Sequence, residues 1–256
     1  MTDLVSFSGT SPGTVRVTHA DRDPFLDEIE ARMRAGQGFT IATLNLDHVV
    51  KIAHDPAFRA AYLAQSHVVA DGNPIVWLSR LAGREVELIP GSELIHPLCE
   101  RAARTNTKVA LLGSTEETLA TAADRLAAAH PGLEVVARIA PAQGFDPDGA
   151  AAKEALEAVG ASGAGLCLLA LGAPKQERLA ARAGPLLPRC GFVSIGAGLD
   201  FIAGTQTRAP DWVRAMAAEW LWRAAGNPRR LAARYLACLA ILPRLGRIAW
   251  TERRRG

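Results

Sequence analysis

The sequence predicts an α/β protein with a mostly parallel sheet, helices on both sheet faces, and a basic helical C-terminal appendage. Short apolar runs at 39–44, 67–70, 108–112, 133–139, 166–171 and 191–195 have the length of buried strands. Longer segments with helical spacing of apolar residues separate them. From residue 108 to 204 strand and helix alternate strictly, which is typical of parallel strands joined by right-handed crossovers. The expected fold class is therefore Rossmann-like.

The helices are marked by their start signals. Asp23-Pro24 and Asp55-Pro56 each place a capping side chain before a proline, and Gly91-Ser92 begins another helix. Residues 1–20 contain little apolar material and are expected to form an edge strand or a loose arm. The strand at 166–171 runs into a polar loop, and the next helix is expected over 178–183.

Charge divides the chain into two parts. Residues 208–256 contain eleven arginines and three acidic residues, a net charge of +8, so residues 1–207 carry −5 of the overall +3. We therefore expect an α/β catalytic domain over 1–207 and a basic, Trp-rich appendage over 208–256. In the appendage, basic residues alternate with Trp and Leu at helical spacing, which favours a helix lying on an anionic membrane surface. An ordinary docked C-terminal helix is the alternative.

Several classes of protein are disfavoured. The four cysteines are widely separated and form no CxxC pair, so a disulfide framework or a Cys-ligated metal is not expected, and no histidines stand at ligand spacing. The N-terminus shows no secretory signal, and no apolar run is long enough to span a membrane.

Polar or glycine-rich loops follow five of the expected strands, at 43–45, 71–73, 113–115, 172–177 and 196–200. The carboxyl ends of parallel strands meet at one edge of the sheet, where ligands bind in open α/β proteins. These loops supply the candidate ligand-binding residues: Thr43, Asn45, Gly72, Asn73, Gly113, Ser114, Gly172, Lys175, Gln176, Glu177, Gly196, Gly198 and Asp200.

Asp71 is the candidate general base, because a carboxylate beside apolar strand residues can have a raised pKa and Gly72 permits close approach of a substrate. A helix cap before Pro74 is the alternative. Thr43 and Asn45 suit hydrogen bonds to a sugar or phosphate, or else a turn. Gly113-Ser114-Thr115 suits a diphosphate, or else caps its helix.

Two D-x-D patterns, Asp21-Arg22-Asp23 and Asp146-Pro147-Asp148, lie in cap and turn contexts, so no metal site is predicted. His48, His54 and His67 are assigned no role.

Ordered motifs over residues 40–235 resemble the WecG/TagA/CpsF family of bacterial glycosyltransferases. They are Thr43-x-Asn45, Asp71-Gly72, Gly91, Leu112-Gly113, the segment from Gly172 to Glu177, Gly196-x-Gly198-x-Asp200-x-x-x-Gly204, Arg208-Ala209-Pro210, the segment from Glu219 to Arg223, and Pro228-Arg229-Arg230. Where the family often has a basic residue shortly before the position of Gly91, this chain has Leu88, Ile89 and Pro90.

The resemblance implies a metal-independent, inverting transferase without a cofactor. It would move a sugar from a UDP-sugar to an undecaprenyl-diphosphate-linked saccharide, as a cytoplasmic protein peripheral on the inner face of the cell membrane. Asp71 matches the family's proposed base, Thr43 and Asn45 its polar pocket, and Gln176 its PKQE glutamine. The residues expected at the lipid diphosphate and membrane are Arg208, Arg223, Arg229 and Arg230.

Two other functions are alternatives to sugar transfer. A non-catalytic nucleic-acid-binding protein would use the Arg-rich tail and bind DNA in a salt-sensitive way, but the arginines surround no reading motif, so no nucleic-acid partner is expected. A dinucleotide-dependent dehydrogenase is disfavoured because no strand is followed by GxGxxG. The sequence leaves open the donor sugar (N-acetylmannosamine, its uronic acid or glucose), the acceptor, and the oligomeric state, a homo-oligomer included.

Overall fold

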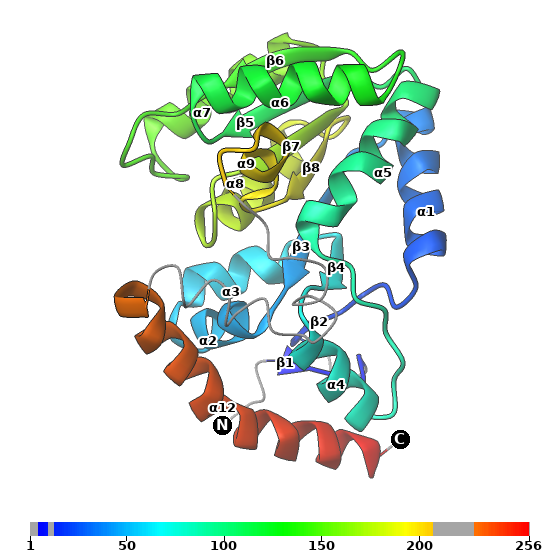
Figure 1. The fold of residues 1–256 in the computed structure, drawn as a ribbon. Coiled ribbons are helices and arrows are strands. Elements are labelled where there is room, and N and C mark those ends of the chain that lie inside the picture. Colours follow the sequence, from blue (N-terminus) through cyan, green and yellow to red (C-terminus); the bar gives the residue numbers. More distant parts are fainter. Residues whose placement is uncertain (1–4, 10–12, 207–227, 256) are drawn as a thin grey trace.

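The computed structural model describes residues 5–9, 13–206 and 228–255. At its centre is a six-stranded sheet in which every neighbouring pair is parallel, in the order β4-β3-β8-β7-β5-β6 (Figure 1). The strands are β3 (Phe39–Leu44), β4 (His67–Ala70), β5 (Val109–Gly113), β6 (Val135–Ile139), β7 (Leu166–Ala170) and β8 (Gly191–Ser194). The predicted mostly parallel α/β sheet is confirmed.

One face of the sheet is covered by α1 (Arg22–Ala35), α5 (Gly91–Arg104), α6 (Glu116–Ala129) and α9 (Gly198–Ala203). Strand side chains alternate between the two faces, and Ile41, Leu168 and Val193 point toward these helices without any exposed surface. This face holds the largest apolar core of the protein.

The opposite face carries two groups of helices. α2 (Leu46–His54), α3 (Pro56–Leu63) and α4 (Asn73–Leu81) cover β3 and β4, while α7 (Ala150–Ala161) and α8 (Lys175–Leu186) cover the strands from β8 to β5. The N-terminal segment adds a two-stranded parallel sheet, β1 (Val5–Ser6) and β2 (Val15–Arg16), to the first group. Helices therefore lie on both faces, as predicted.

The helix α12 (Pro228–Arg253) crosses α2 and α4 along one side of the molecule (Figure 1). It buries Cys238, Leu245 and Ala249 and is held by two polar anchors. Arg234 Nε lies 2.8 Å from Asp47 Oδ1 on α2. Glu252 Oε2 accepts backbone N–H bonds from Phe7 (2.9 Å) and Ser8 (2.8 Å). The predicted C-terminal helix is confirmed, and it continues through Pro243, where the sequence suggested an interruption.

The predicted division at residue 207 lies at the edge of the described residues and stays a prediction. The start of α8 differs from the expectation of a helix over 178–183. The helix begins at Lys175, because the Gln176 N–H already donates to the Gly172 carbonyl (3.2 Å) and the Arg178 N–H to that of Pro174 (3.2 Å). Lys175, Gln176 and Glu177 therefore form a first helical turn rather than a loop.

Candidate active site

The chain leaves two neighbouring strands of the sheet toward opposite faces. After β3 it enters α2 on one face, and after β8 it enters α9 on the other. In open α/β sheets such a divergence marks the expected ligand-binding crevice, beyond the carboxyl ends of the two strands. The polar loops predicted from the sequence follow β3, β4, β5, β7 and β8, and therefore all lie along this edge.

Asp71 and Thr43 meet at the ends of β4 and β3. The Thr43 hydroxyl donates to Asp71 Oδ2 (3.1 Å), and the Asp71 N–H donates to the Leu44 carbonyl (2.8 Å). Thr43 is buried, whereas Asp71 is partly exposed. Gly72 is the N-cap residue of α4, so Asp71 does not occupy the cap position that the alternative gave it. The carboxylate is oriented instead by the Thr43 hydroxyl at the strand ends.

Position 72 requires a glycine because of its backbone conformation. Its φ of 110° lies in a region that side chains rarely adopt, and a Cβ there would lie 3.9 Å from the Asn45 Cβ. Asn45 itself caps α2, since its side-chain oxygen accepts from the His48 N–H (3.0 Å). Asn45 therefore has a helix-capping role that was not predicted, and it also stands beside the Asp71-Gly72 turn. Asn73 is the first residue of α4.

Two buried side chains, Tyr62 and His48, hold the end of β3 in place through the Thr43 carbonyl. The Tyr62 hydroxyl donates to the Thr43 carbonyl (2.9 Å), and His48 Nδ1 lies 3.0 Å from the same oxygen and 2.6 Å from the Tyr62 oxygen. Burial, assisted by Lys51, lowers the pKa of His48 to about 3, so this ring is neutral at physiological pH. No role was expected for either residue from the sequence, because only the fold brings them together.

Gln176 connects β7 to β8. Its Oε1 accepts the Gly196 N–H (3.1 Å), and its Nε2 donates to Glu177 Oε1 (2.8 Å). Glu177 has no exposed surface, and its Oε2 has no hydrogen-bond partner among the described residues. Burial raises the pKa of Glu177 to about 7, although the bond from Gln176 acts in the opposite direction. Glu177 therefore has no surface with which to contact a ligand, and its connection to the strand ends is its hydrogen bond from Gln176.

Ser114 and Asp200 form a separate group at the end of β5. The Ser114 hydroxyl donates to Asp200 Oδ1 (2.7 Å), and Gln206 Nε2 donates to Oδ2 (3.0 Å). Gly113 permits close approach of β7 here, because a Cβ would lie 2.3 Å from the Ala170 carbonyl oxygen. Along the sheet, β5 is three strands from β3, which corresponds to about 14 Å. The two groups are at opposite ends of one edge and do not touch.

The remaining predicted residues fall in two classes. Gly172, Lys175, Gly196 and Gly198 lie in the turns and first helical turns after β7 and β8, as expected. Arg208 and Arg223 lie outside the described residues. Arg229 and Arg230 belong to the first turn of α12, and the positions of their side chains are not described.

Both D-x-D segments have local roles away from the strand ends. Asp21, rather than the predicted Asp23, occupies the N-cap position of α1 and makes no side-chain capping bond, and Asp148 pairs with Arg178 on α8. A surface hollow on α1, lined by Asp27, Glu30, Ala31, Arg34 and Ala35, contains no predicted site residue. Within the described parts of the chain, no helix is long and apolar enough to cross a bilayer.

Comparison with known proteins agrees with these features. A curated protein of Bacillus spizizenii, N-acetylglucosaminyldiphosphoundecaprenol N-acetyl-beta-D-mannosaminyltransferase, is 26% identical over 195 residues, covering 76% of this chain and 74% of the relative. Residues 11–255 match the model of the glycosyl transferase WecG/TagA/CpsF family, and this chain belongs to that family.

Proposed function

We propose that this glycosyltransferase moves a sugar, of the N-acetylmannosamine, N-acetylmannosaminuronic acid or glucose type, from a UDP-sugar to an undecaprenyl-diphosphate-linked saccharide in bacterial cell-surface polysaccharide synthesis. The name of the Bacillus spizizenii relative describes transfer of N-acetylmannosamine to such an acceptor. The observation that carries the proposal for this chain is the Thr43–Asp71 pair at the crevice between diverging connections.

Asp71 is the general base in this mechanism. Its carboxylate takes the proton from the acceptor hydroxyl as the hydroxyl oxygen attacks the anomeric carbon, and the bond from that carbon to UDP breaks with inversion. The hydrogen bond from Thr43 fixes the orientation of the carboxylate, and Tyr62 fixes the backbone of Thr43 in turn. The base is therefore held by a rigid strand end.

The leaving UDP gains negative charge that must be stabilised. We assign this role to backbone N–H groups at the strand ends and helix starts, with Arg208, Arg223, Arg229 and Arg230 as the cationic partners. Ser114 and Gly113 lie where a second part of an extended ligand would reach along the edge. The transfer step in this proposal uses no metal ion.

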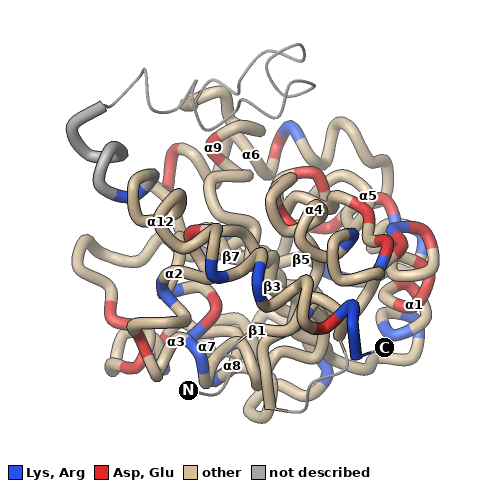
Figure 2. Tube along the Cα trace, turned by 90° about the horizontal axis from the view of Figure 1, so that it is seen from below, with Lys and Arg blue, Asp and Glu red and all other residues tan. Residues whose placement is uncertain are grey.

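The exposed face of α12 provides a membrane-binding surface. Leu236, Leu239 and Trp250 are 66%, 53% and 48% exposed, and helical spacing places them on one stripe with Arg247 and Arg254. The Arg254 guanidinium lies 5.2 Å from the Trp250 ring centre. Figure 2 shows further basic residues along this helix up to the C-terminus. Apolar and cationic side chains on one face suit the surface of an anionic bilayer, which supports a peripheral location on the inner face of the cell membrane.

The test is an assay with a panel of UDP-sugars and a short-chain prenyl-diphosphate saccharide, with products identified by mass. We expect one donor to be transferred, and Asp71→Asn to lower kcat by orders of magnitude without changing the melting temperature. Asp124→Asn is the matched control, because Asp124 is exposed on α6. Near-normal turnover of Asp71→Asn would remove Asp71 from the role of base.

A further inference from the structure

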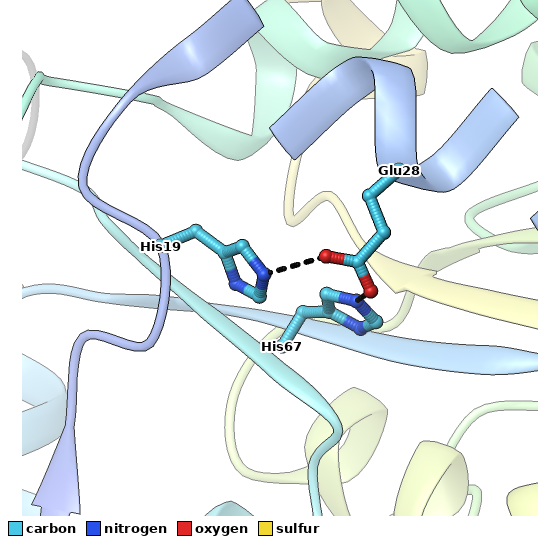
Figure 3. A group of neighbouring side chains, drawn as sticks. All are labelled: His19, Glu28 and His67. Carbon is cyan, nitrogen blue, oxygen red and sulfur yellow. Dashed lines mark hydrogen bonds and ion pairs between the residues drawn. The ribbon is translucent and has the colours of Figure 1, made fainter. Parts of the chain in front are cut away.

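Three side chains with metal-binding atoms converge near the amino-terminal end of β4. They are His19 from the segment between β2 and α1, Glu28 from α1, and His67, the first residue of β4 (Figure 3). His19 Nε2 lies 3.0 Å from Glu28 Oε2, and His67 Nε2 lies 3.1 Å from Glu28 Oε1. All three ligand atoms lie within 4.8 Å of one another. The sequence showed no ligand spacing because the three elements meet only in the folded chain.

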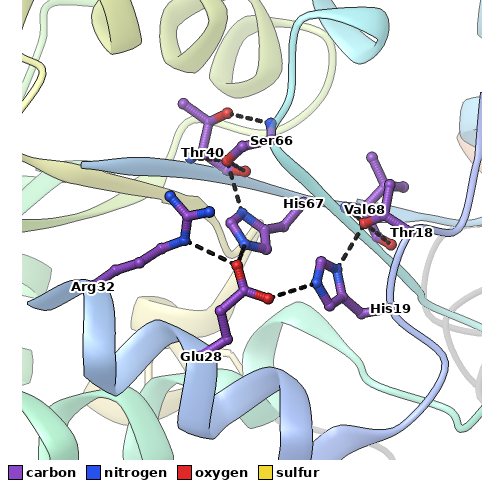
Figure 4. A network of polar contacts seen from close by, with 8 residues as sticks. All are labelled: Thr18, His19, Glu28, Arg32, Thr40, Ser66, His67 and Val68. Atoms are coloured by element: carbon purple, nitrogen blue, oxygen red, sulfur yellow. Dashed lines mark hydrogen bonds and ion pairs between the residues drawn. The ribbon is translucent and has the colours of Figure 1, made fainter. Parts of the chain in front are cut away.

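Each histidine is oriented by a hydroxyl group that is itself fixed on backbone (Figure 4). His19 Nδ1 lies 2.8 Å from Thr18 Oγ1, which accepts the Val68 N–H (2.8 Å) and donates to the Val68 carbonyl (3.2 Å). His67 Nδ1 lies 2.7 Å from Ser66 Oγ, which accepts the Thr40 N–H (2.8 Å) and donates to the Thr40 carbonyl (3.0 Å). The same arrangement thus occurs twice around one carboxylate.

The bonds from both hydroxyls to backbone carbonyls favour one tautomer of each histidine. A hydroxyl has one hydrogen, and when that hydrogen lies on the carbonyl, the hydroxyl oxygen accepts from the histidine Nδ1–H. Each neutral ring then carries its hydrogen on Nδ1 and presents the Nε2 lone pair to Glu28. Arg32 Nε donates to Glu28 Oε1 (2.9 Å), which keeps the carboxyl ionised and without a hydrogen to give. In this tautomer two imidazole lone pairs and a carboxylate converge on one point, which is the donor arrangement of a cation site.

We propose that His19 Nε2, His67 Nε2 and one oxygen of Glu28 bind a divalent transition-metal ion, with zinc as the best match to two imidazoles and a carboxylate. The second ring nitrogen of a metal-bound histidine is usually hydrogen-bonded, as both Nδ1 atoms are here. Metal-bound carboxylates are also hydrogen-bonded, and here Arg32 donates to Glu28. Water would fill the fourth position. His19 is 24% and Glu28 40% exposed at the side chain, so an ion can enter from solvent.

The proposed ion would stabilise the fold and would take no part in sugar transfer. His67 and Asp71 are at opposite ends of β4, about 13 Å apart along an extended strand. The ion would join the N-terminal segment and α1 to β4, the edge strand whose far end carries Asp71. It would thereby stabilise the strand without contacting the substrates.

The test uses the untagged full-length chain, stripped with a chelator and titrated with zinc by calorimetry, with cobalt as a spectroscopic probe. We expect one high-affinity zinc per chain, a raised melting temperature that EDTA reverses, and visible cobalt absorption typical of low coordination number. His19→Ala should abolish all three, and Glu28→Gln should weaken zinc binding strongly. Thr18→Val removes the hydroxyl that orients His19, together with its two bonds to Val68, and should weaken zinc binding by about 10-fold or more.

Two control variants separate this site from other histidines. His54→Ala changes an exposed histidine on α2, and His96→Ala removes the exposed His96–His130 pair, whose nitrogens lie 2.9 Å apart. Both should retain the high-affinity zinc. The proposal is overturned if the wild-type chain binds no stoichiometric zinc, or if His19→Ala and Glu28→Gln bind zinc as the wild type does. It is also overturned if His96→Ala loses the high-affinity zinc while His19→Ala keeps it.

Discussion

Replacing Glu177 by glutamine should remove a pH dependence of stability that arises beneath the active site. The carboxyl has no exposed surface, and burial raises its pKa from 4.5 to about 7. Between these pH values the folded chain keeps a proton that the unfolded chain has lost. The free energy of unfolding therefore falls as the pH rises from 4.5 and stops falling above 7.

The size of this effect follows from the two pKa values. Each pH unit between them costs about 1.4 kcal/mol, so the complete loss is roughly 3 kcal/mol. Most of it falls between pH 5 and pH 8. Glu177→Gln has the same shape, still offers an oxygen to the Gln176 amide, and does not titrate. Relative to the wild type, the variant should gain roughly 2–3 kcal/mol over this interval.

The assay is urea denaturation at pH 5, 6, 7 and 8, followed by tryptophan fluorescence and analysed with a common slope. Glu154→Gln is the matched control, because it makes the same change from carboxyl to amide at an exposed position on α7. A difference between wild type and Glu177→Gln that is the same at all four pH values would refute the reasoning, since it would mean that the buried carboxyl does not take up a proton on folding.

Three further predictions concern the crevice and the helix α12. Thr43→Val removes the hydrogen bond to Asp71 and should lower kcat about 10- to 100-fold with a smaller change in KM; an unchanged kcat would contradict the orienting role. Gly113→Ala places a Cβ 2.3 Å from the Ala170 carbonyl oxygen at a φ of 118°, so we expect the free energy of unfolding in urea to fall by about 3 kcal/mol or more. Gly132→Ala, also at positive φ but without a close neighbour, should lose less. Equal losses in the two variants would show that crowding at Gly113 is unimportant. Leu239→Glu with Trp250→Glu should reduce sedimentation with anionic vesicles while leaving the melting temperature within a few degrees, and undiminished sedimentation would argue against the membrane role of α12.

The strands and their order along the chain were predictable because buried parallel strands leave a local signal. The apolar runs at 39–44 and 166–171 are bounded by polar residues and glycine, and the run at 67–70 ends directly before Asp71, so these strands and the position of Asp71 at a strand end could be read from the sequence. The start of α8 could not, because Pro174, Lys175 and Gln176 look equally like a loop. Their helical state depends on backbone bonds back to Gly172 and Pro174.

Contacts between distant segments left no such signal. Tyr62 lies on an amphipathic helix like many other aromatic residues, and its bond to the Thr43 carbonyl depends on how α3 packs against β3. The group of His19, Glu28 and His67 has the same origin, since its members are separated by 9 and 39 residues. Spacing rules detect ligands that share one element, and these come from three.

The two anchors of α12 have a consequence for the reaction at the bilayer. Arg234 ties the helix to Asp47, two residues beyond Asn45, and Glu252 ties its far end to the N-terminal backbone. With α12 lying on lipid as proposed, the protein would dock as a rigid body, and the height of the Asp71 carboxylate above the headgroups would be set by helix packing. The acceptor's diphosphate would then lie at one fixed depth relative to the crevice, so that the distance of the acceptor hydroxyl from the membrane plane would determine whether it can react.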